Sequence, residues 1–329
     1  MCPAAHRTRC KMRHCELVTD VTGAAIRPTP TFHERSFPMD NRVICVVGPT
    51  ATGKTKMGVA LAKRFGGEVV SVDSMQIYRG MTIGTAAPTA EEMDGVRHHM
   101  VAIADPAESW SVARFTEQAD LCIGDIFRRG KCPVLVGGTG LYLDSILSGR
   151  TFAPGHSGGE IRKSLQAELA REGIESLYRQ LREIDPETAA RLPIRDEKRI
   201  LRALEVYRET GETLTAHDAR TRLQPPKYRA CTIGLTFRDR ADLYARIDRR
   251  VDTMVERGLL REVEALLQTG LPETATALQA IGYKQFLSVY RGDTPVSEAV
   301  AEVKLRSRQY AKRQLTWLRR KDDIHWLLW

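Results

Sequence analysis

The sequence lacks any long apolar run, and none approaches the roughly 20 residues that a membrane-spanning helix needs. Internal repeats and low-complexity tracts are also missing. The seven cysteines show no regular pairing pattern, which argues against a disulfide framework and fits a reducing, intracellular setting. With 42% hydrophobic and 28% charged residues, the 329-residue chain is typical of a globular protein with one large core, or one core and a smaller domain.

Acidic residues are missing from the segment 304–321. Eight cations occur there: Lys304, Arg306, Arg308, Lys312, Arg313, Arg319, Arg320 and Lys321. The whole chain carries a formal net charge of +9 at pH 7, and both observations predict a polyanionic partner, either nucleic acid or a phosphorylated substrate. A basic run is typical of a solvated helix face as well as of an RNA-contacting face, so this pattern leaves both interpretations open.

Residues 1–40 lack periodic apolar structure, and we interpret them as a disordered leader without chemistry. Met39 lies directly before the first strand-like run and is a candidate for the natural start, which would make the leader non-native. A basic targeting presequence is the alternative, which the lack of an amphipathic stretch disfavours. The spacing of the leader's cysteines and histidines matches no common zinc-binding pattern: Cys2, His6, Cys10, His14 and Cys15.

A glycine-bearing turn stands between a strand-like run at 43–47 and a helix-like run at 56–62. Its residues are Gly48, Pro49, Thr50, Ala51, Thr52, Gly53, Lys54 and Thr55. This is the pattern of a phosphate-binding P-loop, in which backbone N–H groups and a helix N-terminus face phosphate oxygens. Lys54 would add a point charge, and Thr55 a hydroxyl for a magnesium ion. The turn therefore predicts polyphosphate binding, without saying which polyphosphate or what is done to it.

Two further strand-like runs, at 68–72 and 133–136, also end in polar loops. The first loop begins with Asp73, and the second contains Thr139 between glycines. Short apolar strands that alternate with helix-like segments, such as 112–128, indicate a parallel sheet. The carboxyl ends of parallel strands converge on the ligand, so we expect both loops to line one site with the P-loop. The predicted fold is α/β, a P-loop parallel sheet flanked by helices.

The composition changes near residue 150, which predicts an inserted all-helical subdomain at 151–222. Charged helical patterns, rich in Arg and Glu and broken at Pro186 and Pro193, fill this part of the chain. A strand pattern returns at 230–235, so the P-loop core is predicted to comprise 41–150 and 223–329. Long helix-like segments follow at 241–268 and 295–320, and the final apolar run at 324–329 is a candidate edge strand.

Several polar residues are candidates for chemistry, each with a structural alternative. Asp73 could be a magnesium-associated carboxylate or a base that faces an acceptor substrate. The Gln76 amide could pair with an adenine edge. Thr139 could place a hydroxyl near the phosphates or belong to a plain turn. His98 and His99 are adjacent and point to different faces, which makes them poor co-ligands of a metal.

Other candidates lie on predicted helices. Arg199 and Arg202 have helical spacing and belong either to an ion-paired surface or to an RNA phosphate contact. Tyr310 and Trp317 are interleaved with cations, so they could stack on bases, although anchoring a terminal helix in the core is the commoner role.

Together, six stretches resemble one family, the tRNA dimethylallyltransferases. They are Gly48–Thr55, Asp73–Gly80, Val136–Tyr142, Arg199–Tyr207, Ala280–Lys284 and Tyr310–Trp317. The first is shared by many nucleotide- and ATP-binding proteins, whereas the second, fifth and sixth are specific. The resemblance covers about residues 41–320. Thr52 stands where the family often has serine, and it keeps the hydroxyl.

The resemblance implies transfer of a dimethylallyl group from dimethylallyl diphosphate to the exocyclic N6 amine of the tRNA adenosine 3′ to the anticodon, position 37. Pyrophosphate would leave. By resemblance, Asp73 is the general base, Lys54 and Thr139 act near the reacting groups, and Mg²⁺ is the cofactor, held near Thr55. Gln76 would help to hold the flipped adenine. Arg246 or Arg250 would assist the diphosphate; Arg250 is the candidate we name, although the sequence does not decide between them.

By resemblance, the partner is the tRNA anticodon stem-loop, whose unpaired bases can be read individually. The implied tRNA contacts are Asp73, Ser74, Met75, Gln76, Arg162, Lys198, Arg199, Ile200, Leu201, Arg202, Gln279, Ala280, Ile281, Gly282, Tyr283 and Lys284. The basic segment 304–321 would complete an electrostatic groove. We expect a cytoplasmic monomer without membrane contact.

Two rival functions share parts of this pattern. A small-molecule or nucleoside kinase would use the same P-loop and Asp73, with Arg199 and Arg202 closing on ATP. The loop at 73–76 combined with the glycine-rich loop at 137–139 disfavours it. A non-enzymatic RNA-binding module that uses nucleotide as a switch would hydrolyse NTP slowly, and its RNA affinity would not need Asp73.

Overall fold

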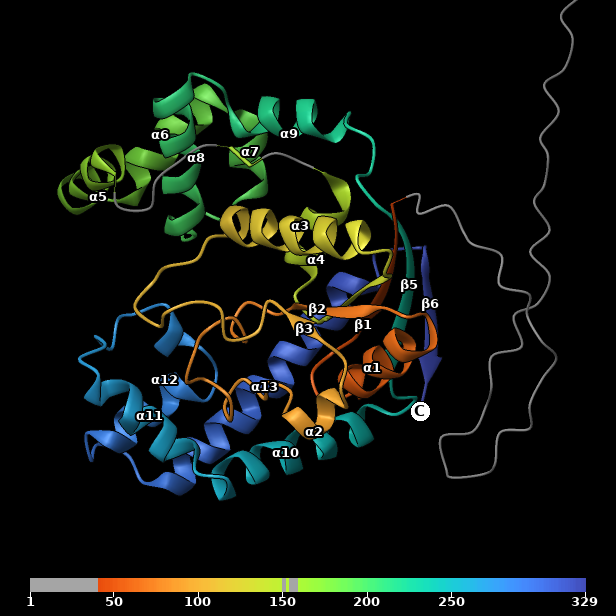
Figure 1. Ribbon diagram of the computed structural model, residues 1–329. Helices are drawn as coiled ribbons and strands as arrows, with labels where there is room; N and C mark the ends of the chain where they lie inside the picture. Colours follow the sequence, from red (N-terminus) through yellow and green to blue (C-terminus); the bar gives the residue numbers. More distant parts are fainter. Residues whose placement is uncertain (1–40, 150–151, 154–158) are drawn as a thin grey trace, which may run out of the picture. The chain divides into compact units, whose positions relative to one another are not determined.

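The computed structural model describes residues 41–149, 152–153 and 159–329 (Figure 1). The predicted leader at 1–40 lies outside the described residues. Among the described residues, no helix is long and apolar enough to cross a membrane.

A six-stranded, all-parallel sheet forms the centre of the fold, with the strand order β3-β2-β4-β1-β5-β6. Its strands are β1 (Arg42–Val47), β2 (Glu68–Val72), β3 (His98–His99), β4 (Pro133–Gly137), β5 (Arg229–Thr236) and β6 (Ile324–Leu328). The predicted parallel sheet is confirmed, and the final apolar run is an edge strand. Strand β3 was not predicted, because a two-residue strand gives no periodic signal.

Helices cover both faces of the sheet (Figure 1). Along β1, Val43, Cys45 and Val47 belong to one apolar cluster, while Val46 belongs to another, because successive side chains of a strand point to opposite faces. The second cluster includes Ala62 of α1 (Lys54–Arg64). The first cluster receives helices α3 (Val112–Arg128), α4 (Gly140–Ser148) and α13 (Val296–Leu318). Sheet and helices therefore form three layers.

Five helices occupy the segment in which we predicted an all-helical insertion. They are α5 (Glu160–Glu172), α6 (Ile174–Ile184), α7 (Pro186–Arg191), α8 (Glu197–Thr210) and α9 (Leu214–Arg222). They share an apolar cluster of their own, with Leu165, Leu181 and Leu204 at most 1% exposed. Pro186 interrupts the helical pattern by starting a new helix, where its missing N–H costs nothing.

The remaining helices follow β5 or lie in the loops. They are α2 (Ala90–Met93), α10 (Arg240–Glu256), α11 (Leu259–Gln268), the 3₁₀ helix η1 (Ala277–Gln279) and α12 (Tyr283–Tyr290). The segment at 241–268, predicted as one long helix, is in fact two helices. Gly258 separates them with a φ of +97°, a left-handed conformation that glycine adopts without a steric cost.

A cluster of charged side chains stabilises the start of β2. It lies at the amino ends of the strands, away from the loops that follow the carboxyl ends. The Glu68 carboxylate is 2% exposed and accepts hydrogen bonds from His99 Nε2 (2.7 Å), Arg129 Nη2 (2.7 Å) and Lys131 Nζ (2.7 Å). The Arg129 hydrogen bond, followed by those of Lys131 and His99, holds the pKa of Glu68 well below its usual range despite burial. The carboxylate is covered by its partners, two of which reach solvent.

Glu68→Gln should lower the free energy of unfolding at pH 7 by about 2–3 kcal/mol. This is less than the 3–5 kcal/mol typical of a fully buried pair, since Arg129 and Lys131 are partly exposed. Because folding depresses the pKa of Glu68, the stabilisation is present above the unfolded pKa of about 4.3 and is lost as pH falls towards the folded pKa. Urea unfolding at pH 7 and pH 3 checks this, with Glu117→Gln on the exposed face of α3 as the control. A deficit of equal size at both pH values would contradict it.

Candidate active site

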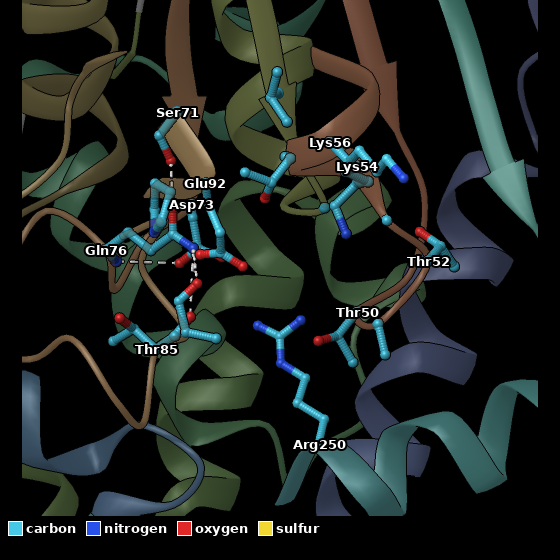
Figure 2. Close-up of a pocket in the computed structure, with 18 of the residues that line it drawn as sticks. Thr50, Thr52, Lys54, Lys56, Ser71, Asp73, Gln76, Thr85, Glu92 and Arg250 are labelled. Carbon is cyan, nitrogen blue, oxygen red and sulfur yellow. Dashed lines mark hydrogen bonds between the residues drawn. The ribbon is translucent and has the colours of Figure 1, made fainter. Parts of the chain in front are cut away.

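Three loops meet at the carboxyl edge of the sheet. Because β2, β4 and β1 are neighbours, the loops that follow them lie side by side, as predicted. They line a cavity of about 620 Å³ that contains Thr50 to Lys56, Asp73, Gln76, Gly137 and Gly138. Figure 2 shows Asp73 and Gln76 on one side of this cavity, Thr50 and Lys54 on the other, and Arg250 between them.

The P-loop is held by bonds within itself. The Pro49 carbonyl accepts hydrogen bonds from Lys54 Nζ at 2.7 Å and from Thr52 Oγ1 at 2.9 Å. Gly53 precedes α1 in the left-handed conformation, with a φ of +84°. The Thr52 hydroxyl therefore stabilises the conformation of the loop. Serine, which is common here in the family that the sequence resembles, has the same hydroxyl and lacks only the methyl group. Thr55 also lines the cavity.

Two cations of this cavity, Lys54 and Arg250, have lowered pKa values. Burial, and then the Arg250 guanidinium, lower the pKa of Lys54 to about 7, against the opposing effect of Asp73. Burial also lowers the pKa of Arg250, with Asp73 and Glu92 opposing it, and Arg250 Nε is a buried donor without a hydrogen-bond partner among the described residues. An anion between Lys54 and Arg250 would relieve both. Of the two candidate arginines, Arg250 extends into the cavity, whereas Arg246 lines it and lies over the Phe237 ring, 5.7 Å from its centroid.

Asp73 has a fixed orientation at the end of β2. Its Oδ1 accepts hydrogen bonds from the backbone N–H groups of Met75 (2.8 Å) and Gln76 (3.3 Å), which closes a tight turn. No hydrogen bond to Oδ2 is present among the described residues. One carboxylate oxygen thus orients the group, while the other is available to a substrate.

The Gln76 amide is engaged by its own surroundings. Its Oε1 accepts from Ser71 Oγ at 2.8 Å, and its Nε2 donates to the carbonyls of Thr85 (3.3 Å) and Ala86 (3.2 Å). Holding an adenine edge, as the resemblance implies, would require these bonds to be exchanged. In the structure they tie β2 to the loop at 85–86, which also lines the cavity.

A glutamine of α13 joins the P-loop to the glycine-rich loop after β4. Gln314 Oε1 accepts from Thr50 N at 3.0 Å, and its Nε2 donates to the Gly138 carbonyl at 3.0 Å. A Cβ at position 138 would overlap Gln314 Nε2, so this approach requires glycine. Thr139 follows directly. Its Oγ1 is buried without a well-formed hydrogen bond among the described residues, although it lies close enough to the Tyr310 hydroxyl to influence the pKa of that group.

A second cavity, of about 320 Å³, adjoins the first. The two share Thr50, Asp73, Thr85, Arg250 and Tyr310. The additional lining is largely apolar, and it also contains several of the predicted tRNA contacts: Ser74, Met75, Gln279, Ala280 and Ile281. Asp73 therefore lies at the junction of a cationic cavity and a more apolar one, an arrangement that can bring an anionic donor and a planar acceptor together.

Three of the predicted tRNA contacts have buried side chains in the structure. Ile200 and Leu201 are 0% and 4% exposed and pack in the core of the five-helix segment, so their side chains are not available to RNA. Tyr283 is fully buried, and its hydroxyl donates to Glu262 Oε1 at 2.5 Å. Gly282 is buried as well, whereas Lys198, Arg199, Gln279 and Lys284 are exposed.

Two of the three predicted arginines of the insertion meet at a buried carboxylate. Arg202 donates to Glu205 Oε2 at 2.9 Å and to the Ala153 carbonyl at 2.7 Å, and Arg162 lies 3.8 Å from the same carboxylate. Arg199 is 72% exposed and pairs with Asp196 of its own helix start. The ion-paired alternative thus holds for Arg199 and Arg202 in the structure, with Arg199 still open to solvent.

The basic segment is partly neutralised by acids that lie far away in the sequence. Lys304 and Arg308 pair with Asp252 and Asp248 of α10, and Lys321 pairs with Asp144 of α4. Arg306 pairs with Glu302. Of the segment's eight cations, four form no ion pair with the residues that the structure describes, and all four are exposed: Lys312, Arg313, Arg319 and Arg320. The unpaired charge of the segment 304–321 therefore lies at 312–320, in the last turns of α13 and the two residues that follow it.

The two aromatic residues of the same helix have different roles. Tyr310 lines both cavities. Trp317 is 37% exposed, donates from Nε1 to Asp144 Oδ2 at 2.9 Å, and lies in a hollow with Lys312, Arg313 and Arg320. Neither is a plain core anchor. His98 also lines the main cavity, whereas His99 is part of the Glu68 cluster.

Two residues that support the site were not predicted from the sequence. One is Gln314. The other is Glu262 of α11, which accepts hydrogen bonds from the backbone N–H groups of Thr82 (2.8 Å) and Gly84 (3.0 Å) and so fixes the loop that precedes Thr85. Neither residue stands at a strand end, so no local pattern signals its role. Gln314 does lie inside a stretch that resembles the family, and that was the available hint.

The comparisons with known proteins agree on one family. A family model described as IPP transferase matches residues 76–321, and a second, isopentenyl transferase, matches residues 41–104. The tRNA dimethylallyltransferase of Acetivibrio thermocellus is 44% identical, with 88% of this chain and 92% of that protein covered. The one from Oceanobacillus iheyensis is 46% identical over 88% of this chain and 91% of that protein.

Solved structures give the same result. The tRNA isopentenylpyrophosphate transferase of Bacillus halodurans is 44% identical and matches with a TM-score of 0.64, covering 88% of this chain and 90% of that one. A eukaryotic dimethylallyltransferase acting on tRNA is 30% identical and matches with a TM-score of 0.76, over 88% of this chain and 74% of that one. On sequence and fold alike, this chain belongs to the IPP transferase family.

Proposed function

We propose that this protein transfers the dimethylallyl group of dimethylallyl diphosphate to the N6 amine of adenosine 37 in tRNA and releases pyrophosphate. One observation carries the proposal: Asp73 lies where a cationic cavity, lined by the P-loop, Lys54 and Arg250, adjoins a more apolar cavity. The family relatives named for this reaction on tRNA support it.

The donor's diphosphate would bind between the P-loop amides, Lys54 and Arg250. Lys54 and Arg250 are partly buried and lack a full complement of countercharge, so they favour an anion there. As the bond between the allylic carbon and the diphosphate oxygen breaks, negative charge grows on the leaving group, and these cations and amides would stabilise it. Thr139 would place its hydroxyl at the same edge.

The acceptor base would enter the second cavity. The exocyclic amine of adenine is a poor nucleophile, because its lone pair is delocalised into the ring. Asp73 is oriented by the N–H groups of Met75 and Gln76 and keeps Oδ2 for the amine proton. As general base it would accept this proton while the new bond between N6 and the allylic carbon forms.

Magnesium fits the residues present. Among the described residues, no cluster of three or more His, Cys, Asp or Glu could hold a metal alone. Mg²⁺ commonly binds through few protein oxygens together with substrate phosphates, and the Thr55 hydroxyl lines the same cavity as the proposed diphosphate site. Bound there, the ion would supply positive charge for the leaving pyrophosphate.

The tRNA would lie along the exposed cations of the helical insertion and of α13. We propose 151–222 as the tRNA-binding insertion, with Arg162, Lys198, Arg199 and Arg202 at its surface, and 41–150 with 223–329 as the catalytic core. A cytoplasmic location follows from the proposed tRNA substrate, and we propose that the enzyme acts as a monomer.

Incubation with radiolabelled dimethylallyl diphosphate, magnesium and unmodified tRNA that reads codons beginning with U tests the function directly. Label in the adenosine next to the anticodon is the expected outcome. Phosphate transfer from ATP to a small acceptor, with no label in tRNA, would instead favour a kinase.

In this assay, Asp73→Asn should lower turnover by about two to four orders of magnitude while donor and tRNA affinities stay close to wild type. Asparagine keeps Oδ1 for the turn and loses the ability to accept the amine proton. Glu92→Gln removes the other carboxylate facing Arg250 and should have a much smaller effect. Unchanged turnover in Asp73→Asn would exclude it as the base.

The affinity for tRNA should fall steeply with salt, because bound cations release counterions from phosphate. Replacing Lys312 or Arg320 by Ala should weaken binding and reduce the slope of log K against log salt by about one each. Lys304→Ala is the matched control, since Lys304 pairs with Asp252. Equal slopes in all variants would mean that α13 does not touch phosphate.

A further inference from the structure

The side chain of Trp329, directly after β6, contacts the P-loop, 277 residues away along the chain. Its indole Nε1 donates a hydrogen bond to the Thr52 carbonyl at 3.1 Å. The ring also lies beside the next residue, since a Cβ at Gly53 would be 3.9 Å from it. Trp329 is 43% exposed, so its role in the core is minor compared with its contact to the loop.

The position of this indole is fixed by the backbone. The Trp329 N–H donates to the Thr236 carbonyl at 3.0 Å, and the Trp329 carbonyl accepts from Arg238 N at 3.3 Å. Both partners belong to β5 or to the residues directly after it. Trp329 is therefore held beside the P-loop by the same strand pairing that attaches β6 to the sheet.

The hydrogen bond sets the orientation of one peptide group of the loop. In a planar trans peptide, C=O and N–H point in opposite directions. With the Thr52 carbonyl directed at the indole, the N–H of Gly53 is directed to the other side, and Gly53 is one of the residues that line the cationic cavity. A P-loop binds phosphate only when its N–H groups face inward, so a carbonyl free to rotate would weaken the site.

We propose that Trp329 is a positioning residue for the diphosphate. Its indole N–H holds the Thr52 carbonyl outward, so that the Gly53 N–H faces the bound anion. The inference rests on the proposed function of the P-loop as the diphosphate site. It assigns part of the donor affinity to a side chain outside the loop, directly after the edge strand β6.

The test compares Trp329→Phe, which keeps a ring and loses the N–H, with the wild-type protein. Pyrophosphate binding by calorimetry should weaken roughly two- to ten-fold, the loss expected for one hydrogen bond. The donor KM should rise by a similar factor, while kcat and the tRNA KM stay unchanged. Replacing Trp329 by benzothienylalanine, which has the shape of tryptophan without the N–H, should give the same loss and separates the hydrogen bond from packing.

Trp326→Phe is the matched control, because Trp326 lies in β6, the strand that directly precedes Trp329, and packs against Gly234 of β5. Pyrophosphate should change the tryptophan fluorescence of the wild type and of Trp326→Phe more than that of Trp329→Phe. Wild-type pyrophosphate affinity and donor KM in both Trp329 variants would overturn the proposal while leaving the transfer reaction intact. A wild-type protein that neither binds pyrophosphate nor transfers the dimethylallyl group would instead refute the proposed function.

Discussion

The proposed site depends on two partly buried cations that lack sufficient countercharge. Lys54 and Arg250 face one cavity with Asp73 and Glu92 as the nearby carboxylates. Burial lowers the pKa of both, and repulsion by Arg250 lowers that of Lys54 further. Moving cations out of water costs free energy, and a bound anion beside them offsets this cost. The fold therefore provides a preformed anion-binding site, whose positive charge the proposed diphosphate would neutralise. The same cations would stabilise the negative charge that grows on the leaving group.

The sheet makes this arrangement possible. Because β2, β4 and β1 are adjacent, three loops from distant parts of the chain end at one edge, and Gly138 lets α13 approach closely enough for Gln314 to bond two of them. The helix that lines the acceptor cavity through Tyr310 thus also supports the donor loop. A displacement of α13 would therefore change the surroundings of both proposed substrates.

Local patterns predicted the parts of the site that are encoded locally. A strand, a glycine turn and a helix follow one another in the sequence, so the P-loop, the Asp73 loop and the parallel sheet could be predicted. Contacts assigned to every residue of a motif were predicted less well. In a helical stretch such as 198–202, some side chains face solvent and others, like that of Ile200, are buried in the core. Which cations of 304–321 are free of ion pairs could not be predicted, because their acidic partners, including Asp248 and Asp144, lie elsewhere in the sequence. Gln314 and Glu262 act through tertiary contacts that no local pattern reveals.

Proton uptake on binding pyrophosphate tests the central claim most directly. With a pKa of about 7, Lys54 is largely neutral at pH 8 and protonated at pH 6 before the anion binds. Calorimetry in buffers of different ionisation enthalpy counts the protons, and subtracting the value of Lys54→Gln removes the titration of pyrophosphate itself. The account predicts that the wild type takes up about one more proton than the variant at pH 8 and no more than the variant at pH 6. Equal proton counts for wild type and variant at both pH values would contradict it.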